Sequence, residues 1–277
     1  MKNSQQLKDL IKNMTKESGI NPQILITKYM IERLLERISV SKYKDRFILK
    51  GGMLISSLIG YELRSTMDVD TTIKRIPISE ENLHNIFNEI TKINIDDNVS
   101  FKIKSIRYIR EESEYGGMRV SIDGMINKTI IPFKVDVTTG DAITPKEIEY
   151  DYELMLEDKK INLYSYNIET ILAEKIETLI SRGITNTRIR DFYDIHIIYK
   201  TQDKKINYET LNKAIDATFK NRKTSNMIEK KDKILNEVIN DEEIKNLWRN
   251  YQKEYPYAKS ITWLEINESL INIFRKI

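Results

Sequence analysis

The chain has 277 residues and a net charge of +3, and 31% of its residues are charged against 40% that are hydrophobic. This length allows one large or two modest domains with cores of their own, and the slightly basic charge permits nucleic-acid binding without requiring it. The chain has no cysteine and only two histidines, which excludes a disulfide framework, a thiolate zinc site, a cysteine nucleophile and a histidine-rich metal centre.

No segment reaches the roughly 20 apolar residues that a membrane span requires, and the N-terminus lacks a signal-peptide core. We therefore expect a cytoplasmic protein without a membrane partner.

Two helices are predicted at the start of the chain. Scattered apolar positions over residues 1–18 indicate a short amphipathic helix. Asn21 and Pro22 form a helix start signal, because an asparagine side chain caps the first turn and proline suits the first helical position. Apolar residues then recur at helical spacing over residues 24–38, so the second helix buries one face. Both helices are interpreted as scaffold.

A glycine pair and an aspartate pair come next. The apolar run at residues 47–49 predicts a strand, and Gly51 and Gly52 permit a sharp turn into a helix, where backbone N–H groups can face a phosphate. Asp68 and Asp70 lie two residues apart in an extended stretch, so both carboxylates leave the same face of a strand. Adjacent carboxylates repel each other unless a cation lies between them, and Mg²⁺ prefers hard oxygen ligands together with phosphates. Each motif alone is more often a turn or a solvated strand end, but their combination favours a metal and nucleotide site.

The middle of the chain predicts one helix and several strands. The predicted ranges are a helix over 79–92 and strands over 101–108, 119–122 and 131–138, with a polar segment over 111–117. Asp136 lies on the polar face of the last strand, where a carboxylate needs a partner. The basic residues Lys102, Lys104 and Arg107 suit the solvated face of an edge strand, and a nucleic-acid contact is the alternative.

Residues 144–160 are acidic, and we expect them to form an irregular junction between two domains, 1–160 and 161–277. A helix is predicted over residues 170–181, and the chain beyond residue 204 is helix-rich. Its lysine clusters suit either a solvated helix surface or contact with an RNA backbone.

Two sequence motifs resemble those of a known family. LKGG followed by R-x-T-x-D-x-D is similar to the first motif of the AbiEii/AbiGii-type toxins, nucleotidyltransferase-like proteins of bacterial abortive-infection toxin–antitoxin systems. LAEK followed by SRGITNTRIRDFYD resembles the later L-A-x-K and R-D-x-x-D motif of that family. The resemblance covers about residues 45–75 and 168–200. Many members carry Thr or Ser after the two glycines, where this chain has Met53, with Ser56 and Ser57 as the nearby hydroxyls.

The resemblance implies an α/β (α+β) fold, in which a polymerase-β-like nucleotidyltransferase domain with a mixed sheet precedes a helical C-terminal domain. It implies that Asp68, Asp70 and a third carboxylate from a later strand bind Mg²⁺ or Mn²⁺. Asp136 is the residue that we place there, with Asp123 and Asp141 as the alternatives.

The resemblance also implies the remaining site residues. Gly51, Gly52, Ser56 and Arg64 are expected to bind the nucleotide. Lys175 matches the motif lysine, expected to engage the nucleotide phosphates. Asp191 matches its acidic partner, giving a catalytic set of Asp68, Asp70, Asp136, Lys175 and Asp191. The alternative for Asp191 is helix capping, because a carboxylate is favourable in the first turn of a helix.

The implied activity is that of a toxin which transfers a nucleoside monophosphate from an NTP to an RNA, the 3′ end of tRNA, and so blocks translation in phage defence. The implied partners are an NTP, the RNA acceptor and an antitoxin encoded nearby, which need not touch the toxin. The alternatives are a nucleotidyltransferase that acts on a protein or a small molecule, and a non-catalytic nucleotide-binding toxin.

Overall fold

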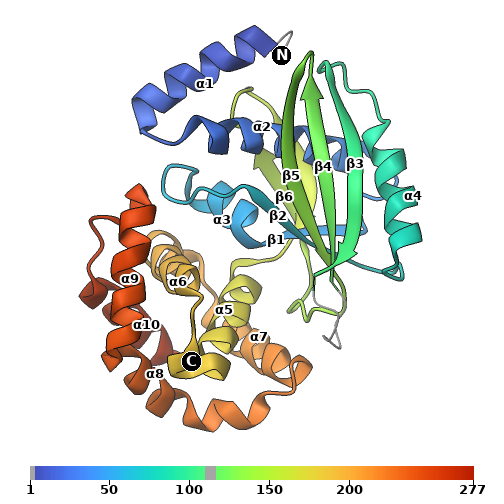
Figure 1. Cartoon of the computed structure of the whole chain (residues 1–277). Coiled ribbons are helices and arrows are strands. Elements are labelled where there is room, and N and C mark those ends of the chain that lie inside the picture. The colour runs from blue at the N-terminus through green and yellow to red at the C-terminus, as the bar shows by residue number, and fades with distance from the viewer. Residues whose placement is uncertain (1–3, 110–116) are drawn as a thin grey trace. The chain divides into compact units, whose positions relative to one another are not determined.

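The computed structural model describes residues 4–109 and 117–277. The chain forms two compact units, which we call the sheet unit (Met1–Gly140 and Ile148–Ser165) and the helical unit (Asp141–Glu147 and Tyr166–Ile277). Figure 1 shows that the sheet unit contains a mixed sheet with helices and that the helical unit contains helices. The predicted fold class, a mixed sheet followed by a helical region, is confirmed. The polar segment predicted over 111–117 lies outside the described residues, apart from Gly117.

The sheet unit contains a seven-stranded mixed sheet with the strand order β3-β4-β5-β2-β1-β7-β6. The strands are β1 (Phe47–Lys50), β2 (Asp68–Ile73), β3 (Val99–Tyr108), β4 (Met118–Ile126), β5 (Thr129–Thr138), β6 (Ile148–Glu153) and β7 (Lys160–Ser165). The helices of this unit are α1 (Ser4–Ser18), α2 (Pro22–Val40), α3 (Gly51–Ile59) and α4 (Glu80–Thr91). β2 pairs in parallel with β5 and β1 in parallel with β7, and the other neighbours are antiparallel.

The two faces of the sheet differ in character. Alternate residues of β4 and β5 are buried, Val135 among them, as the period of a strand requires. Helix α2 packs against this apolar face, since a side chain at Gly124 would come within 3.1 Å of the Met30 sulfur. Arg119 and Asp136 occupy the alternate positions, so their side chains point to the opposite, polar face of the sheet. The predicted aspartates are therefore presented on the face that α2 does not cover.

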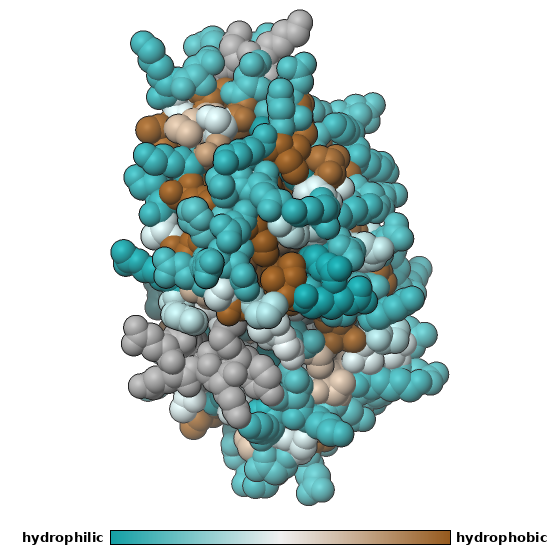
Figure 2. All heavy atoms as spheres, turned by 90° about the vertical axis from the view of Figure 1, so that its right-hand side faces the viewer, coloured by the Kyte–Doolittle hydropathy of each residue, from teal (hydrophilic) through white to brown (hydrophobic). Residues whose placement is uncertain are grey.

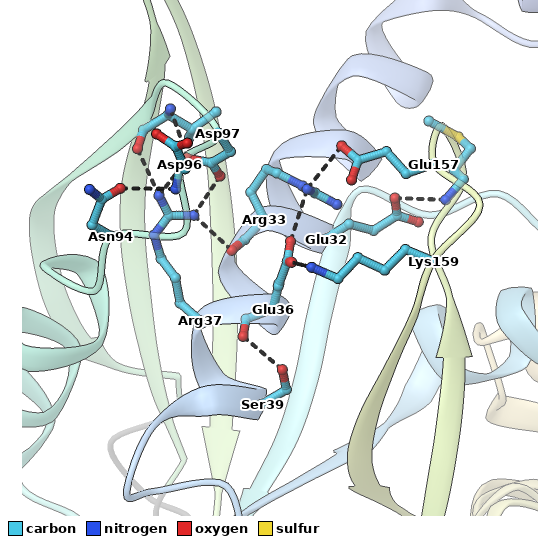
Figure 3. Close-up of polar contacts among 12 residues, drawn as sticks. Glu32, Arg33, Glu36, Arg37, Ser39, Asn94, Asp96, Asp97, Glu157 and Lys159 are labelled. Carbon is cyan, nitrogen blue, oxygen red and sulfur yellow. Dashed lines mark hydrogen bonds and ion pairs between the residues drawn. The ribbon is translucent and has the colours of Figure 1, made fainter. Parts of the chain in front are cut away.

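Helix α2 carries buried charged side chains besides its apolar stripe. Figure 3 shows the polar contacts that they make. Arg37 donates two hydrogen bonds to Asp97, at 2.7 and 2.8 Å, ahead of β3. On the other side of the helix, the Glu32 carboxylate accepts hydrogen bonds from the Tyr152 hydroxyl at 3.1 Å and the Met155 amide at 3.0 Å. Removing one partner from a buried ion pair costs about 3–5 kcal/mol, so the Arg37–Asp97 pair fixes one side of α2 strongly. The hydrogen bonds of Glu32 fix the other side.

The expectation of an irregular junction over residues 144–160 is wrong for residues 148–153 and for Lys160, where β7 begins. Residues 148–153 form β6, which pairs with β7 at the edge of the sheet. Tyr152 is the one residue of β6 that is fully buried, and acidic side chains are frequent among the rest. An edge strand with so few apolar residues lacks the alternation that reveals a strand in a sequence.

The helical unit consists of α5 (Ile168–Arg182), α6 (Ile189–Gln202), α7 (Tyr208–Asn221), α8 (Lys231–Asn240), α9 (Glu242–Glu254) and α10 (Trp263–Phe274). Helix α5 packs on α6 and α7, and α6 packs on α9 and α10. The core includes the fully buried side chains Phe192, Tyr193 and Trp248. His196 is buried on α6 and hydrogen-bonded to the Ser269 hydroxyl at 2.8 Å.

The face shown in Figure 2 carries mainly hydrophilic side chains, with small apolar areas between them. Single exposed apolar residues of this kind are normal on folded proteins. Among the helices that the structure describes, none combines the length and the apolar character needed to cross a bilayer.

Candidate active site

The glycine turn between β1 and α3 lies directly against Asp70. Gly51 has a φ of +65°, a conformation that glycine adopts without steric cost. A side chain at Gly51 would place its Cβ 2.1 Å from the Asp70 carboxylate oxygen, which is too close for any atom. The backbone N–H of Gly52 donates a hydrogen bond to Asp70. The two motifs that are separate in the sequence therefore form one structure.

Substituting Gly51→Ala tests this close contact. We expect the variant to lose more stability than the strain of placing alanine at a positive φ accounts for. The additional loss arises because the new methyl group must push the Asp70 carboxylate aside. Gly19→Ala is the matched control, since Gly19 has a φ of +70° and nothing within 4 Å of the added carbon. The strain of alanine in the left-handed backbone conformation alone costs about 1–2 kcal/mol in both variants. Equal urea-unfolding free energies for both variants would contradict the close packing.

Two other residues of the first motif also support the turn. A side chain at Gly52 would meet the Thr66 hydroxyl at 3.0 Å and the Arg64 guanidinium at 3.1 Å. Arg64 is buried, and its guanidinium donates a hydrogen bond to the Ser65 carbonyl at 2.7 Å. The structure therefore places Arg64 beneath the turn that was predicted to hold phosphates.

Ser56, a predicted nucleotide contact, faces the interior of the sheet unit. Its hydroxyl is buried and accepts a hydrogen bond from the Lys28 ammonium group at 3.4 Å. Burial lowers the pKa of Lys28, and the nearby Glu32 carboxylate opposes that effect. The neighbouring Ser57 hydroxyl is hydrogen-bonded to Tyr150 at 2.8 Å.

Strand pairing brings the predicted carboxylates of the sheet unit together. β2 and β5 run parallel, with Asp70 directly opposite Asp136 and Asp68 opposite Lys134. All four side chains share the polar face, because partners in register point the same way. Asp123, the first alternative for the third carboxylate, lies on β4 and forms an ion pair with Lys104 at 3.5 Å.

The remaining alternative, Asp141, belongs to the helical unit, after the turn at Gly140. Asp136 is thus the one of the three that the sheet places opposite Asp70.

The electrostatics of Asp70 reflect this crowding. Burial raises the pKa of Asp70, Lys50 opposes the shift, and the charges of Asp136 and Asp68 raise the pKa further. Lys50 lies opposite Asp70 on β1. A cation placed among the three carboxylates would relieve both their repulsion and the cost of burying Asp70.

An arginine supplies part of that positive charge in this structure. Arg119 on β4 lies opposite Asp136, and its guanidinium donates hydrogen bonds of 2.7 and 2.8 Å to the two carboxylate oxygens. The hydrogen bonds to Asp136 raise the pKa of Arg119 against the opposing effect of burial, and the charges of Asp68 and Asp70 add to the rise. Arg119 therefore contacts Asp136 directly, and the charges of Asp68 and Asp70 also favour its charged form.

The residues fit a divalent cation by the chemistry of their donors. Asp68, Asp70 and Asp136 offer hard carboxylate oxygens from one face of two paired strands, as Mg²⁺ and Mn²⁺ prefer. Among the described residues, no three acidic or histidine side chains are arranged to hold a metal ion in the conformation observed. Both oxygens of Asp136 are directed at Arg119 in that conformation.

The helical unit holds a second cluster, built from the later motif. The Lys175 ammonium group on α5 donates hydrogen bonds to Asp191 at 2.6 Å and to Asp194 at 2.7 Å, both on α6. Arg188 donates to the other oxygen of Asp191 at 2.7 Å. Burial acts to lower the pKa of Lys175, but the two carboxylates outweigh burial and raise it. Burial has the opposite effect on Asp191, whose pKa it acts to raise. The charges of Lys175 and Arg188 outweigh burial, so the pKa of Asp191 is lowered.

The structure thus brings the predicted residues together as two clusters. The cluster in the sheet unit contains Gly51, Gly52, Arg64, Asp68, Asp70 and Asp136. The cluster in the helical unit contains Lys175 and Asp191. Sequence reasoning missed the pairing of Arg119 with Asp136. Placing both strands in one antiparallel hairpin would have revealed it, since the register sets these residues opposite each other.

A mixed sheet that brings a glycine turn next to paired strand aspartates is the arrangement of a nucleotidyltransferase. The family model described as "Nucleotidyl transferase AbiEii toxin, Type IV TA system" matches residues 33–266, so the chain belongs to this family and is a nucleotidyltransferase. The resemblance inferred from the motifs is confirmed.

A solved structure supports this fold. JHP933 from Helicobacter pylori is 18% identical, with a TM-score of 0.52, over 93% of this chain and 94% of that one. Another H. pylori protein, described as a nucleotidyltransferase candidate, is 19% identical with a TM-score of 0.49, over 93% and 97% of the two chains. A search of the curated proteins finds no match.

Proposed function

We propose that the protein transfers a nucleoside monophosphate from an NTP to the 3′ end of an RNA, with Mg²⁺ or Mn²⁺, and that tRNA is the acceptor. The observation that carries this proposal is the register of Asp70 with Asp136 beside the glycine turn. The choice of tRNA rests on the resemblance to the AbiEii toxins, as does a cytoplasmic role in phage defence under an antitoxin encoded nearby. That antitoxin need not bind the protein.

In the proposed reaction, the oxygen of the acceptor hydroxyl forms a bond to the α-phosphorus. The bond from the α-phosphorus to the oxygen bridging to the β-phosphate breaks, and pyrophosphate leaves with the electron pair. The hydroxyl proton passes to a carboxylate of the site, Asp136, or to water. A divalent cation, when bound, would polarise the α-phosphate and neutralise the charge of the leaving group.

The protein's own residues supply positioning. The glycine turn would hold the terminal phosphates through its backbone N–H groups, and the Asp70 carboxylate is fixed against that turn. The resemblance assigns phosphate binding to Lys175. Because two carboxylates engage its ammonium group, binding a phosphate would require Lys175 to exchange one of them.

A polyanionic acceptor is supported by cations on the same sheet face. Arg107 on β3 lies opposite Arg119, which lies opposite Asp136, and Lys134 lies opposite Asp68. Arg107 and Lys134 are exposed. Positive side chains flanking the carboxylates are suited to the phosphates of a nucleic acid.

The proposal is tested by incubating the purified protein with each α-³²P-labelled NTP, Mg²⁺ and either total tRNA or total protein. We expect label on tRNA, removed by mild 3′-exonuclease trimming and prevented by EDTA. Label on protein alone would overturn the RNA acceptor and favour the alternative of a protein-modifying enzyme. Label on neither, with all four NTPs, would count against transfer to a macromolecule.

A non-catalytic toxin is the other alternative. Expressing the Asp68→Ala, Asp70→Ala double variant in a bacterial host separates it from an enzyme. We expect growth to recover, because the variant loses two carboxylates of the proposed cation site. Full toxicity at equal protein levels would show that catalysis is not the source of the effect.

A further inference from the structure

We infer that Arg119 occupies the Asp136 carboxylate, and that a divalent cation gains this carboxylate as a ligand only by displacing the guanidinium. Arg119 is then a positioning residue that sets how tightly the site binds its cation. This inference rests on the proposed function, since it concerns the same carboxylates, but it makes a separate claim about a residue outside both sequence motifs.

The geometry of the pair favours this role. Arg119 uses two nitrogens, Nε and Nη2, to donate to both oxygens of Asp136, at 2.7 and 2.8 Å. Bidentate pairs of this kind are among the stronger hydrogen-bonded contacts in proteins. Both oxygens accept a hydrogen bond from the guanidinium, so the lone pairs that face Arg119 are not available to a cation.

The backbone does not need to move for the exchange. Asp136 is held opposite both Asp70 and Arg119 by the pairing of β5 with β2 and β4. The Arg119 side chain is 41% exposed, whereas that of Asp136 is 16% exposed. The guanidinium can therefore rotate into solvent and release both Asp136 oxygens, so the exchange is a change of side-chain rotamer.

Charge explains why the two cations compete. Asp136 acts on Arg119 most strongly, through two hydrogen bonds, and the charges of Asp68 and Asp70 add to its effect, so the guanidinium serves mainly as the counter-ion of Asp136. A divalent cation bound among the same carboxylates would repel the guanidinium and replace it. An arginine in this place balances the charge of Asp136 while no cation is bound, and lowers the affinity for the cation that replaces it.

The test measures Mn²⁺ binding by isothermal titration calorimetry at pH 7.5, without nucleotide, on wild type and on Arg119→Gln. We expect the variant to bind about tenfold more tightly, which is a gain of about 1.4 kcal/mol. Arg119→Lys keeps the charge but not the bidentate contact, and is expected to lie between the two. Arg107→Gln is the matched control, because it removes a neighbouring charge from the same face without touching Asp136, and we expect less than a twofold change.

A double-mutant cycle separates displacement from a general effect of charge. In an Asp136→Asn background, Arg119→Gln is expected to leave Mn²⁺ affinity unchanged. The same tenfold gain in that background would overturn the inference, because the effect would not act through Asp136. Unchanged or weaker binding by Arg119→Gln in the wild-type background would overturn it as well.

A second readout follows the arginine itself. The Arg119 Nε–H signal in a ¹H–¹⁵N spectrum, assigned with Arg119→Lys, is expected to shift or disappear by solvent exchange as Mg²⁺ is added. A signal unchanged at saturating Mg²⁺ would contradict displacement, even if the enzyme transfers nucleotides normally. By contrast, an absence of nucleotide transfer combined with tight Mn²⁺ binding by Arg119→Gln would count against the proposed function and leave this inference standing.

Discussion

Substituting Asp70→Asn is expected to lower nucleotidyl transfer by at least about 10³-fold, equivalent to about 4 kcal/mol of transition-state stabilisation. The carboxylate lies against the glycine turn and opposite Asp136, so it is the group best placed to hold a cation beside the phosphates. The amide keeps the shape but loses the negative charge. The measurement is the rate of ³²P transfer to RNA at saturating Mg²⁺.

The same substitution is expected to leave the fold at least as stable as the wild type. Because burial and neighbouring charges raise the pKa of Asp70 above its ordinary value of 3.8, ionisation of this group opposes folding at neutral pH. This loss of stability is absent below the unfolded-state pKa of Asp70, where the carboxyl group is protonated in both states. It develops as the pH rises from there through the raised folded-state pKa. Urea unfolding should therefore show that the stability of Asp70→Asn relative to wild type grows between pH 4 and pH 7.

Asp45→Asn is the control for both measurements, because Asp45 is an exposed residue outside the site whose carboxylate lies 3.4 Å from the Arg46 side chain. We expect it to retain wild-type activity and stability. Wild-type transfer by Asp70→Asn would remove Asp70 from the catalytic site. A large loss of stability in that variant would instead show that the carboxylate supports the turn.

Substituting Lys175→Met is expected to destabilise the helical unit by about 3–5 kcal/mol, because it leaves Asp191 and Asp194 buried beside each other without their shared cation. The Lys175 side chain is 12% exposed, and those of the two aspartates are 4% and 1% exposed. Solvent therefore screens the cluster only slightly. Urea unfolding at pH 7, followed by circular dichroism, measures the change.

The effect should depend on pH with a defined sign. The folded-state pKa of Asp191 is lowered, so its contribution to stability is present above the unfolded-state value near 3.8 and is lost as the pH falls through the lowered value. The pKa of Lys175 is raised, so its contribution is present below 10.5 and is lost only as the pH rises above that value. In Lys175→Met, burial acts on Asp191 without the opposing charge of Lys175, so the variant loses stability as the pH rises and Asp191 ionises. The difference between wild type and Lys175→Met should accordingly be smallest below pH 4 and grow as the pH rises to 7.

Two further variants make this prediction specific. Lys213→Met removes an exposed lysine that pairs with Glu209 one turn away, and we expect an unchanged unfolding midpoint. Adding Asp191→Asn and Asp194→Asn to Lys175→Met should recover much of the lost stability, because no buried charge then lacks a partner. Failure of the triple variant to recover would indicate that Lys175 supports the fold by packing and not by charge.

The order and spacing of the motifs predicted which face of a strand presents the paired aspartates. The spacing of Asp68 and Asp70 put both carboxylates on one face of a strand, and the strand β2 bears this out. Helix starts were also predicted correctly where a local signal existed, as at Asn21, whose side chain accepts a hydrogen bond from the Gln23 amide. Such signals depend on residues within a few positions of each other.

Long-range pairing could not be predicted in the same way. β6 was missed because an edge strand with one fully buried residue has no apolar periodicity. The apolar stripe of α2 was recognised, but the burial of Glu32 and Arg37 on the same helix was not, since a charged residue is expected at the surface unless its partner is known. Those partners lie 60 and 120 positions away along the chain.

The amino-acid sequence by itself determined the family, the composition limits and the residue types of the site, because these depend on local spacing and chemistry. Only the tertiary structure decided which carboxylate lies opposite Asp70, that Gly51 leaves room for that carboxylate, and that Arg119 binds Asp136. The physical reason is strand register. A contact across paired strands is set by how whole strands align in the sheet, and that alignment results from burying one apolar face, a property of many residues at once.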